Sequence, residues 1–518
     1  MLRSTGIGEH PHSSRWWVAG FAATALVVLA LWGAAGLRGG LSRPLVVALA
    51  QTTPTLDPHL HNETVLWTVL SNFCEGLVAF DPEMRLVPSL AVRWQRLDDH
   101  RVRFELRSGV RFHDGEPLTS ADVVASLERG RNHPRSGIAH HLVDVTAVEA
   151  DGENAVVLHT SGPAATLLNR LVFVAVVPRR LAAEEEIFEP VGTGPYRFVR
   201  RAADGTLVAR STRSWHRRPP FRTVHFRLGF PQEQQLALLM SGGVDVLAWL
   251  PDRALRFVSQ DPHVRPVPQP RLSVQMLSVV ADAAPGVAGS WLADRRVRRA
   301  LLLGIDRQRL VEQGYRGNGT VASQYVHPVV FGFDSGLTPY PFDREAARRI
   351  LEDVGDIPDV ELVLGHPSSA PVVIDAILED LRSLGVQVRA RSMPFDEFLR
   401  RARNHELPLL YYGRTAATGD ASDVLNAMVH TPDTARGWGR ENFTGFSDPR
   451  VDALLERCEQ ELAPDSRRSM LYEVQRLVLD ELPLLPLTIR FGHVGVSNRI
   501  EVIPRFDQRL LVAEFRRR

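Results

Sequence analysis

The chain has 518 residues, 44% of them hydrophobic and 23% charged, so it is long enough to bury more than one core. Its formal net charge of +1, without a block of like charge, argues against nucleic acid as a partner. All 61 basic residues are arginine. Without lysine a Walker phosphate loop and a Schiff-base amine cannot form, which excludes two large classes of enzyme.

An apolar segment lies near the N-terminus. Residues 16–37 contain no charged side chain, and a helix of that length rises about 33 Å, the thickness of a bilayer core. Secretory signals usually have a shorter apolar core. We therefore expect residues 1–43 to form a cytoplasmic tail and a transmembrane anchor, with cleavage as a signal after Ala35 as the alternative. Because Cys74 is the first cysteine, we expect no lipid-modified cysteine ahead of it.

The stretch 75–129 carries the strongest local signals. Apolar and charged residues alternate over 101–107, which is the period of a half-buried strand. Two glycine turns then enclose a short strand at 110–112. Thr119 and Asp122 form a T-x-x-D capping pattern, which predicts that a helix begins there.

Later segments alternate between helix and strand. The run 342–355 predicts a helix with Asp343 as its N-cap and a glycine as its stop. The pattern over 359–388 predicts a β-α-β unit. Two further helices are predicted from Pro449 and over 470–479. Strands that alternate with helices indicate mixed α/β lobes.

Longer motifs follow one another in a fixed order. They are TLDP at 55–58, EGLV at 75–78, LVPSLAVRW at 86–94, FELRSGVRFHDGEPLTSADVV at 104–124, VGTGPYRF at 191–198, SGGVDV at 241–246, DRRVRRALLLGIDRQRLV at 294–311 and FSDPRVDALL at 446–455. In these motifs the chain resembles the family 5 solute-binding proteins of ABC importers, which capture peptides, nickel complexes and similar solutes. The resemblance covers nearly everything after about residue 45.

The resemblance implies an α/β, periplasmic-binding-protein-like fold of two mixed α/β lobes joined by a hinge. It divides the chain into lobe I (44–78, 191–269 and 489–518), a small subdomain inserted in that lobe (79–190) and lobe II (270–488). The proline-rich stretch 262–270 is the best linker or hinge candidate, because proline disfavours helices and central strands. Ligand would be enclosed between the lobes by hinge closure.

The resemblance also points to one ligand-binding segment, 411–426. In peptide-binding relatives an aspartate in such a segment pairs with the α-amino group of the peptide, and Asp420 occupies the matching place. Its carboxylate could form a charge-assisted hydrogen bond with an ammonium group. Asp423 is a rival, and Ala421 stands where many relatives have an aromatic residue. The competing interpretation is a loop aspartate that caps the following helix.

Other side chains around that segment could line a pocket. Tyr411, Tyr412 and Trp438 could supply apolar and stacking walls, although core packing is the commoner fate of aromatic residues. Arg414 could bind a ligand carboxylate bidentately, whereas a solvated arginine is the usual outcome.

The remaining polar motifs do not indicate catalysis, a metal site or a cofactor. VGTGPYRF lacks the third glycine of a dinucleotide fingerprint, so a structural turn is the better interpretation. The histidines at 59 and 61, and at 140 and 141, have no acidic or cysteine partner at ligand spacing, which favours surface or turn histidines. Cys74 and Cys458 lie on distant elements, so we expect no disulfide.

The sequence therefore predicts a non-enzymatic extracytoplasmic receptor. It would capture peptides or a similar small polar solute and deliver them to ABC permease subunits in the membrane. We expect a monomer on the periplasmic or extracellular face of the cell membrane, held there by its N-terminal segment. The alternatives are a membrane-tethered sensor of the same fold, a binder of a metal chelate or an oligosaccharide, and a form secreted after signal cleavage.

Overall fold

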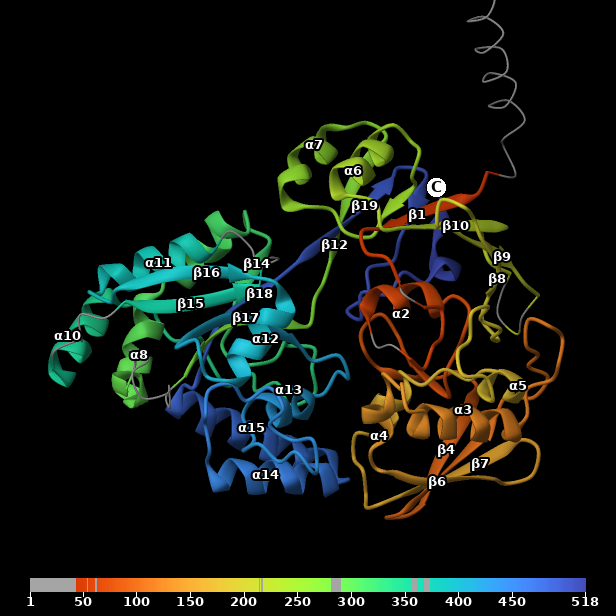
Figure 1. The fold of residues 1–518 in the computed structure, drawn as a ribbon, viewed down its shortest axis with the longest axis horizontal. Coiled ribbons are helices and arrows are strands. Elements are labelled where there is room, and N and C mark those ends of the chain that lie inside the picture. Colours follow the sequence, from red (N-terminus) through yellow and green to blue (C-terminus); the bar gives the residue numbers. More distant parts are fainter. Residues whose placement is uncertain are drawn as a thin grey trace, which may run out of the picture.

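The structure is a computed structural model that describes residues 43–53, 55–60, 63–213, 215, 218–280, 290–355, 361–367 and 373–518. Two large sheets form separate lobes, and a smaller sheet forms a third body below the first lobe (Figure 1). The anchor predicted at 16–37 lies outside the described residues. Within the described part of the chain, no helix is long and apolar enough to cross a membrane.

The first sheet has seven strands in the order β12-β19-β11-β1-β10-β9-β8. Their bounds are β1 (Leu45–Leu49), β8 (Tyr196–Arg201), β9 (Leu207–Ser211), β10 (Thr223–Leu228), β11 (Val246–Leu247), β12 (Val264–Gln269) and β19 (Gly492–Ser497). Strand β1 runs parallel to both β10 and β11. Helices α6 (Gln232–Met240) and α7 (Leu255–Gln260) lie on one side and α2 (Thr64–Leu70) on the other (Figure 1).

The second sheet has six strands in the order β14-β18-β13-β17-β15-β16. Their bounds are β13 (Ser273–Val279), β14 (Gly319–Val321), β15 (Leu362–Pro367), β16 (Val388–Met393), β17 (Leu409–Thr415) and β18 (Leu484–Arg490). The surrounding helices are α8 (Arg295–Gly304), α9 (Arg307–Arg309), α10 (Arg344–Val354), α11 (Ile374–Ser383), α12 (Phe395–Arg403), α13 (Ala421–Met428), α14 (Pro449–Gln460) and α15 (Pro464–Glu481).

The third body is a four-stranded sheet in the order β4-β5-β7-β6, which we call the insert. Its elements are β4 (Ala91–Asp98), β5 (Arg101–Leu106), β6 (Val145–Ala150), β7 (Ala155–Thr160), α3 (Ser120–Asn132), α4 (Leu167–Leu171) and α5 (Arg179–Ala182). A hairpin of β2 (Val78–Phe80) and β3 (Leu86–Pro88) precedes it, and β20 (Ile500–Glu501) pairs with β21 (Arg516–Arg517) near the C-terminus. Helix α3 packs against strands β6 and β7.

The local sequence signals are confirmed where they depend on neighbouring residues. Strand β5 buries every second side chain, and the Thr119 amide donates to the Asp122 carboxylate over 2.9 Å at the start of α3. Asp343 caps α10 by accepting from the amide of Ala346 at 2.8 Å. The predicted β-α-β unit is present, since β15 and β16 pair in parallel across α11.

The proline-rich stretch 262–270, predicted as a linker or hinge, is mostly a strand and ends where the chain first crosses between the sheets. Most of it forms β12, which pairs only with β19, at the edge of the first sheet. Pro266 and Pro268 are two residues apart, so both ring nitrogens point to the open side of this edge strand, away from β19. No backbone N–H donor is needed on that side, because no strand pairs there. The chain passes between the two sheets immediately afterwards, at 270–272, and again at Phe491.

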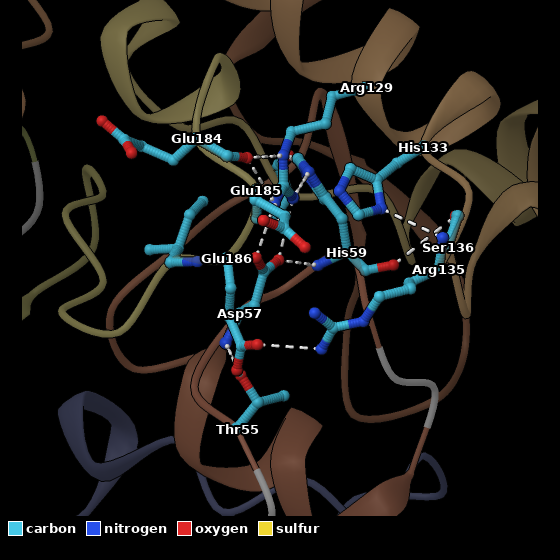
Figure 2. Close-up of polar contacts among 12 residues, drawn as sticks. Thr55, Asp57, His59, Arg129, His133, Arg135, Ser136, Glu184, Glu185 and Glu186 are labelled. Atoms are coloured by element: carbon cyan, nitrogen blue, oxygen red, sulfur yellow. Dashed lines mark hydrogen bonds and ion pairs between the residues drawn. The ribbon is translucent and has the colours of Figure 1, made fainter.

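A buried ion pair joins the TLDP loop of the first lobe to the insert (Figure 2). The two terminal nitrogens of Arg129, on α3, donate to the two oxygens of Asp57 over 2.9 and 2.7 Å. Asp57 also accepts from the amides of His59 and Ile187, each at 2.9 Å. These donors lower the pKa of Asp57 against the opposing effect of burial. The Asp57 carboxylate therefore connects the TLDP loop to helix α3 and to the backbone at Ile187.

His59 completes this network as a neutral ring. Arg129 can only donate, so Nδ1 of His59 accepts its hydrogen bond at 3.1 Å, and Nε2 donates to the carbonyl of Ala175 at 2.8 Å. Burial lowers the pKa of His59 to about 4. His59 lies in a turn, as one of the two predicted alternatives had it, but its ring is fully buried and not at the surface. His61 lies outside the described residues. With both nitrogens occupied, His59 has no lone pair for a metal.

The two cysteines are free, as expected, and both are buried. Burial raises the pKa of both thiols to about 12, so neither supplies a thiolate near neutral pH.

Arg129→Met is expected to destabilise the protein by about 3–5 kcal/mol, because the Asp57 carboxylate stays buried without its partner. Chemical denaturation measures this loss. Arg93→Met is the matched control, since the Arg93 side chain is 77% exposed in its pair with Glu105 and should cost less than about 1 kcal/mol. Equal effects of the two substitutions would contradict a structural role for the buried pair.

Acid should destabilise the protein through His59. The unfolded chain binds a proton on this ring below about pH 6.5, whereas the folded chain binds it only near pH 4. The free energy of unfolding therefore falls with decreasing pH between these values, by up to about 1.4 kcal/mol per pH unit from this group. His59→Gln keeps an acceptor and a donor and should reduce that slope. An unchanged pH dependence of the denaturation midpoint would refute this assignment.

Candidate functional site

The segment predicted to bind ligand runs from the end of β17 into α13. Strand β17 is a central strand between β13 and β15, and its residues are buried up to Tyr412, whereas Gly413 is exposed. The chain then forms an irregular turn over 416–419, and Asp420 is the N-cap of α13. We call residues 413–423 the ligand loop.

Asp420 is held inside the second lobe. Its carboxylate accepts from the amide of Ser422 at 3.0 Å and caps α13. Both of its oxygens also accept from Arg467 of α15, and the contact to Nη2 measures 2.9 Å. The Asp420 and Arg467 side chains are each 6% exposed, so two opposite charges neutralise each other in the interior. The capping role is therefore present in the structure, and pairing with a ligand amine stays a prediction.

Arg414 is not a solvated arginine. Its Nη2 donates to Asp423 at 3.1 Å, and its Nη1 donates to Glu441. The three side chains are between 17% and 21% exposed, so they stay within reach of a ligand from solvent. Both carboxylates pair with the Arg414 guanidinium, and Glu441 also lies 3.8 Å from the exposed guanidinium of Arg440. We call Arg414, Asp423 and Glu441 the acidic cluster.

The predicted aromatic residues do not form one wall. Tyr411 lies in the core, where its hydroxyl is 2.7 Å from that of Tyr315. Tyr412 packs between Phe398 and Phe443, with ring centroids 5.6 and 5.8 Å away. Both rings belong to a central strand that is covered on both faces, so neither presents a stacking surface to solvent.

Trp438 lies apart from the two tyrosines. It packs edge-on against His430 at 4.5 Å, and the guanidinium of Arg436 lies 4.9 Å from its ring. Its backbone exchanges two hydrogen bonds with Asp433, each 3.0 Å long. Trp438 therefore stabilises the turn after α13 and remains only partly buried.

The insert holds the ligand loop from the opposite side. The side-chain amide of Asn169, on α4, donates to the carbonyl of Thr418 at 2.7 Å. Glu459 of α14 accepts from Thr166 at 3.2 Å and from Arg170 at 3.0 Å, both in the insert. The same carboxylate accepts from Asn426 of α13 at 2.8 Å. The insert and the second lobe thus meet directly beside the loop.

His140 of the insert faces the charges of the acidic cluster. Burial lowers its pKa to about 4, with the positive charge of Arg440 as the next cause and the Asp423 carboxylate acting in the opposite direction. The ring is therefore neutral near pH 7 and adds no positive charge to this face.

The VGTGPYRF motif forms a structural turn, as expected. Side-chain atoms at 192 and 194 would come within 2.8 Å of backbone atoms of residues 72–74, so both positions require glycine. His113 supports the turn by accepting from the amide of Gly192 at 3.2 Å and donating to the carbonyl of Gly194 at 3.0 Å. The two glycines are therefore explained by the close packing of this turn on residues 72–74.

One surface pocket lies away from the ligand loop. This pocket of about 490 Å³ lies between the first lobe and the end of the inserted segment and is lined by Thr55, Leu56, Glu186, Phe188, Glu189, Phe198, Arg200 and Arg201. Both signs of charge occur in it, and it shares no residue with the ligand loop. Among the residues that the structure describes, no group of three or more metal-ligating side chains comes together.

The partners that fix the loop could not be found from sequence. Arg467 is 47 residues from Asp420, and Arg170 is 289 residues from Glu459. No spacing rule links such positions, because tertiary packing alone brings them together.

Comparison with known proteins agrees with the fold and with the motif order. A model of the family described as bacterial extracellular solute-binding proteins, family 5 Middle, matches residues 85–436. The glutathione-binding protein GsiB of Pectobacterium atrosepticum is 25% identical over 491 residues, which cover 90% of this chain and 91% of that protein.

Two solved structures share the fold. The substrate-binding protein CtaP of Listeria monocytogenes has a TM-score of 0.82 at 16% identity and covers 92% of this chain and 99% of its own. The dipeptide-binding protein of Pseudoalteromonas sp. SM9913, in complex with Met-Leu, has a TM-score of 0.76 at 19% identity. The match covers 92% of this chain and 100% of that protein. The predicted periplasmic-binding-protein fold is confirmed.

Proposed function

Since the chain belongs to the bacterial extracellular solute-binding proteins of family 5, we propose that it captures a short peptide or a similar small polar solute and delivers it to an ABC permease. The family match over residues 85–436 carries this proposal. A relative named for glutathione and a structural neighbour that holds Met-Leu favour peptides over other solutes. Capture requires neither catalysis nor a cofactor, because ligand acts by stabilising the closed, docking-competent state.

Two partly exposed carboxylates beside the ligand loop support an ammonium group on the solute. Asp420 is the residue that the resemblance favours, but Arg467 already neutralises its charge inside the lobe. Asp423 and Glu441 are 17% and 21% exposed, and Arg440, the second cation near Glu441, is 45% exposed and can move away from it. Asp423 and Glu441 therefore become the first partners of the ammonium, and Asp420 fixes the shape of the loop. Arg414 orients the two carboxylates instead of binding a ligand carboxylate.

The proposed receptor works as a monomer at the outer face of the membrane. The apolar segment 16–37 anchors it, which keeps the solute-binding lobes near the permease without a lipid modification. A tethered sensor with the same fold is the alternative, and stimulation of uptake by a cognate permease in reconstituted vesicles separates the two roles.

Asp423→Asn should weaken binding of Met-Leu about tenfold or more, because one carboxylate can no longer compensate both Arg414 and an ammonium. Isothermal titration with Met-Leu and with N-acetyl-Met-Leu measures this, and the acetylated probe should bind the variant and the wild type alike. Asp465→Asn, at a side chain that is 95% exposed, is the control.

Asp420→Asn distinguishes the two carboxylates. If Asp420→Asn loses affinity for Met-Leu but not for N-acetyl-Met-Leu, and Asp423→Asn keeps its affinity for both, then Asp420 binds the amine. Melting curves of both variants show whether a lost affinity reflects a lost fold.

The N-terminal sequence of the chain purified from its host tests the anchor. We expect the apolar segment to be retained and the protein to sediment with membranes. A mature chain that begins near Ala35 or Gly36 would contradict the anchor and support secretion.

A further inference from the structure

The two crossings between the lobes bring together two arginines on one indole ring. Trp249 follows β11 by two residues. The guanidinium carbon of Arg271 lies 3.7 Å from the centroid of its ring, and that of Arg490 lies 5.5 Å away. Arg271 belongs to the first crossing, after β12, and Arg490 ends β18 at the second. We call Trp249, Asp252, Arg271, Arg490 and His493 the hinge cluster.

Only one of these two arginines has a counter-charge. Arg490 donates to the Asp252 carboxylate over 2.6 Å. Among the described residues, Arg271 forms no hydrogen bond or ion pair, and its buried Nε is without an acceptor. Burial and the neighbouring charge of Arg490 lower the pKa of Arg271 to about 9. One positive charge in the hinge cluster is therefore uncompensated.

His493 adds a further unsatisfied group beside these charges. The residue is 9% exposed, and its Nδ1 has no hydrogen-bond partner. Burial lowers its pKa, with Arg271 and Arg490 acting in the same direction and Asp252 against it, so the ring is neutral near pH 7. A neutral imidazole can donate one hydrogen bond to an oxygen.

The Arg271 guanidinium occupies space that is open only because residue 492 is a glycine. A side chain at Gly492 would place its first carbon 2.6 Å from Nε and 2.7 Å from Nη2 of Arg271. Gly492 pairs with Gln269 of β12, so this position lies inside the first sheet. The guanidinium is thus fixed between the glycine backbone and the indole ring, which limits the conformational entropy that it would lose on binding an anion.

The hinge cluster lies where open α/β sheets bind ligands. Strands β1 and β11 run parallel, and Trp249 follows the carboxyl end of β11. Ligands of such sheets bind outside the carboxyl ends of the strands. In this chain the same edge borders both crossings between the lobes.

We propose that Arg271, assisted by Arg490 and His493, binds a carboxylate group of the captured solute. This assignment rests on the proposed function and adds to it that the solute is anionic at one end. The planar guanidinium matches a carboxylate with two parallel hydrogen bonds. Trp249 stacks on the arginine and keeps its fork in place.

The test compares each peptide acid with its amide. Titration of the full-length wild type with Met-Leu and with Met-Leu amide should show at least tenfold tighter binding of the acid. Arg271→Gln should bind the two probes alike, whereas Arg271→Lys should keep part of the preference for the acid. Arg450→Gln is the matched control, because Arg450 is an exposed arginine paired with Asp448 and should leave the preference unchanged.

The outcomes separate this proposal from the proposed function. Equal binding of acid and amide by the wild type, or an acid preference that survives Arg271→Gln, would overturn the carboxylate site and leave peptide capture intact. Failure of the wild type to bind any probe in a panel that also includes glutathione would overturn peptide capture itself. The comparison of Met-Leu with Met-Leu amide in the wild type needs no variant, so it tests the carboxylate site even if Arg271→Gln unfolds.

Discussion

The buried pair of Asp57 and Arg129 is the contact on which the arrangement of the three bodies depends. It fixes the insert against the first lobe, and the insert then holds the second lobe through Asn169 and Glu459. Desolvation of two charges is costly unless further hydrogen bonds satisfy them. Here two amides, the His59 ring and two carbonyls complete the network. The position of the ligand loop thus depends on a carboxylate more than three hundred residues away.

Because the chain contains no lysine, arginine supplies the positive charge in its buried ion pairs with carboxylates. Arg129 with Asp57, Arg467 with Asp420 and Arg505 with Asp507 each join two nitrogens to two carboxylate oxygens. Lysine cannot reproduce this geometry, since its ammonium is a point charge without a planar fork. Arg307, although buried, also has two guanidinium nitrogens without a partner among the described residues, so the missing acceptor of Arg271 gains its meaning from its position beside both crossings between the lobes.

Sequence patterns predicted the features that depend on neighbours a few residues apart. Thr119 with Asp122, and Asp343 with its glycine stop, follow capping rules that operate within one helical turn. The edge strand at Pro266 and Pro268 was missed, because the sequence does not show on which side of a strand a partner lies. The resemblance located the ligand loop, yet the pairing of Asp420 with Arg467 depends on tertiary packing and could not be foreseen.

The two charged sites differ in how their charges balance. In the acidic cluster the carboxylates of Asp423 and Glu441 face the guanidinium groups of Arg414 and Arg440, whereas the hinge cluster carries one net positive charge. A short peptide near neutral pH carries a positive charge at one end and a negative charge at the other. Loss of water on lobe closure strengthens every charge interaction inside, so on the proposed carboxylate site a solute without a carboxylate would leave the charge of Arg271 uncompensated. That penalty would supply selectivity for anionic groups without a close fit to the side chains.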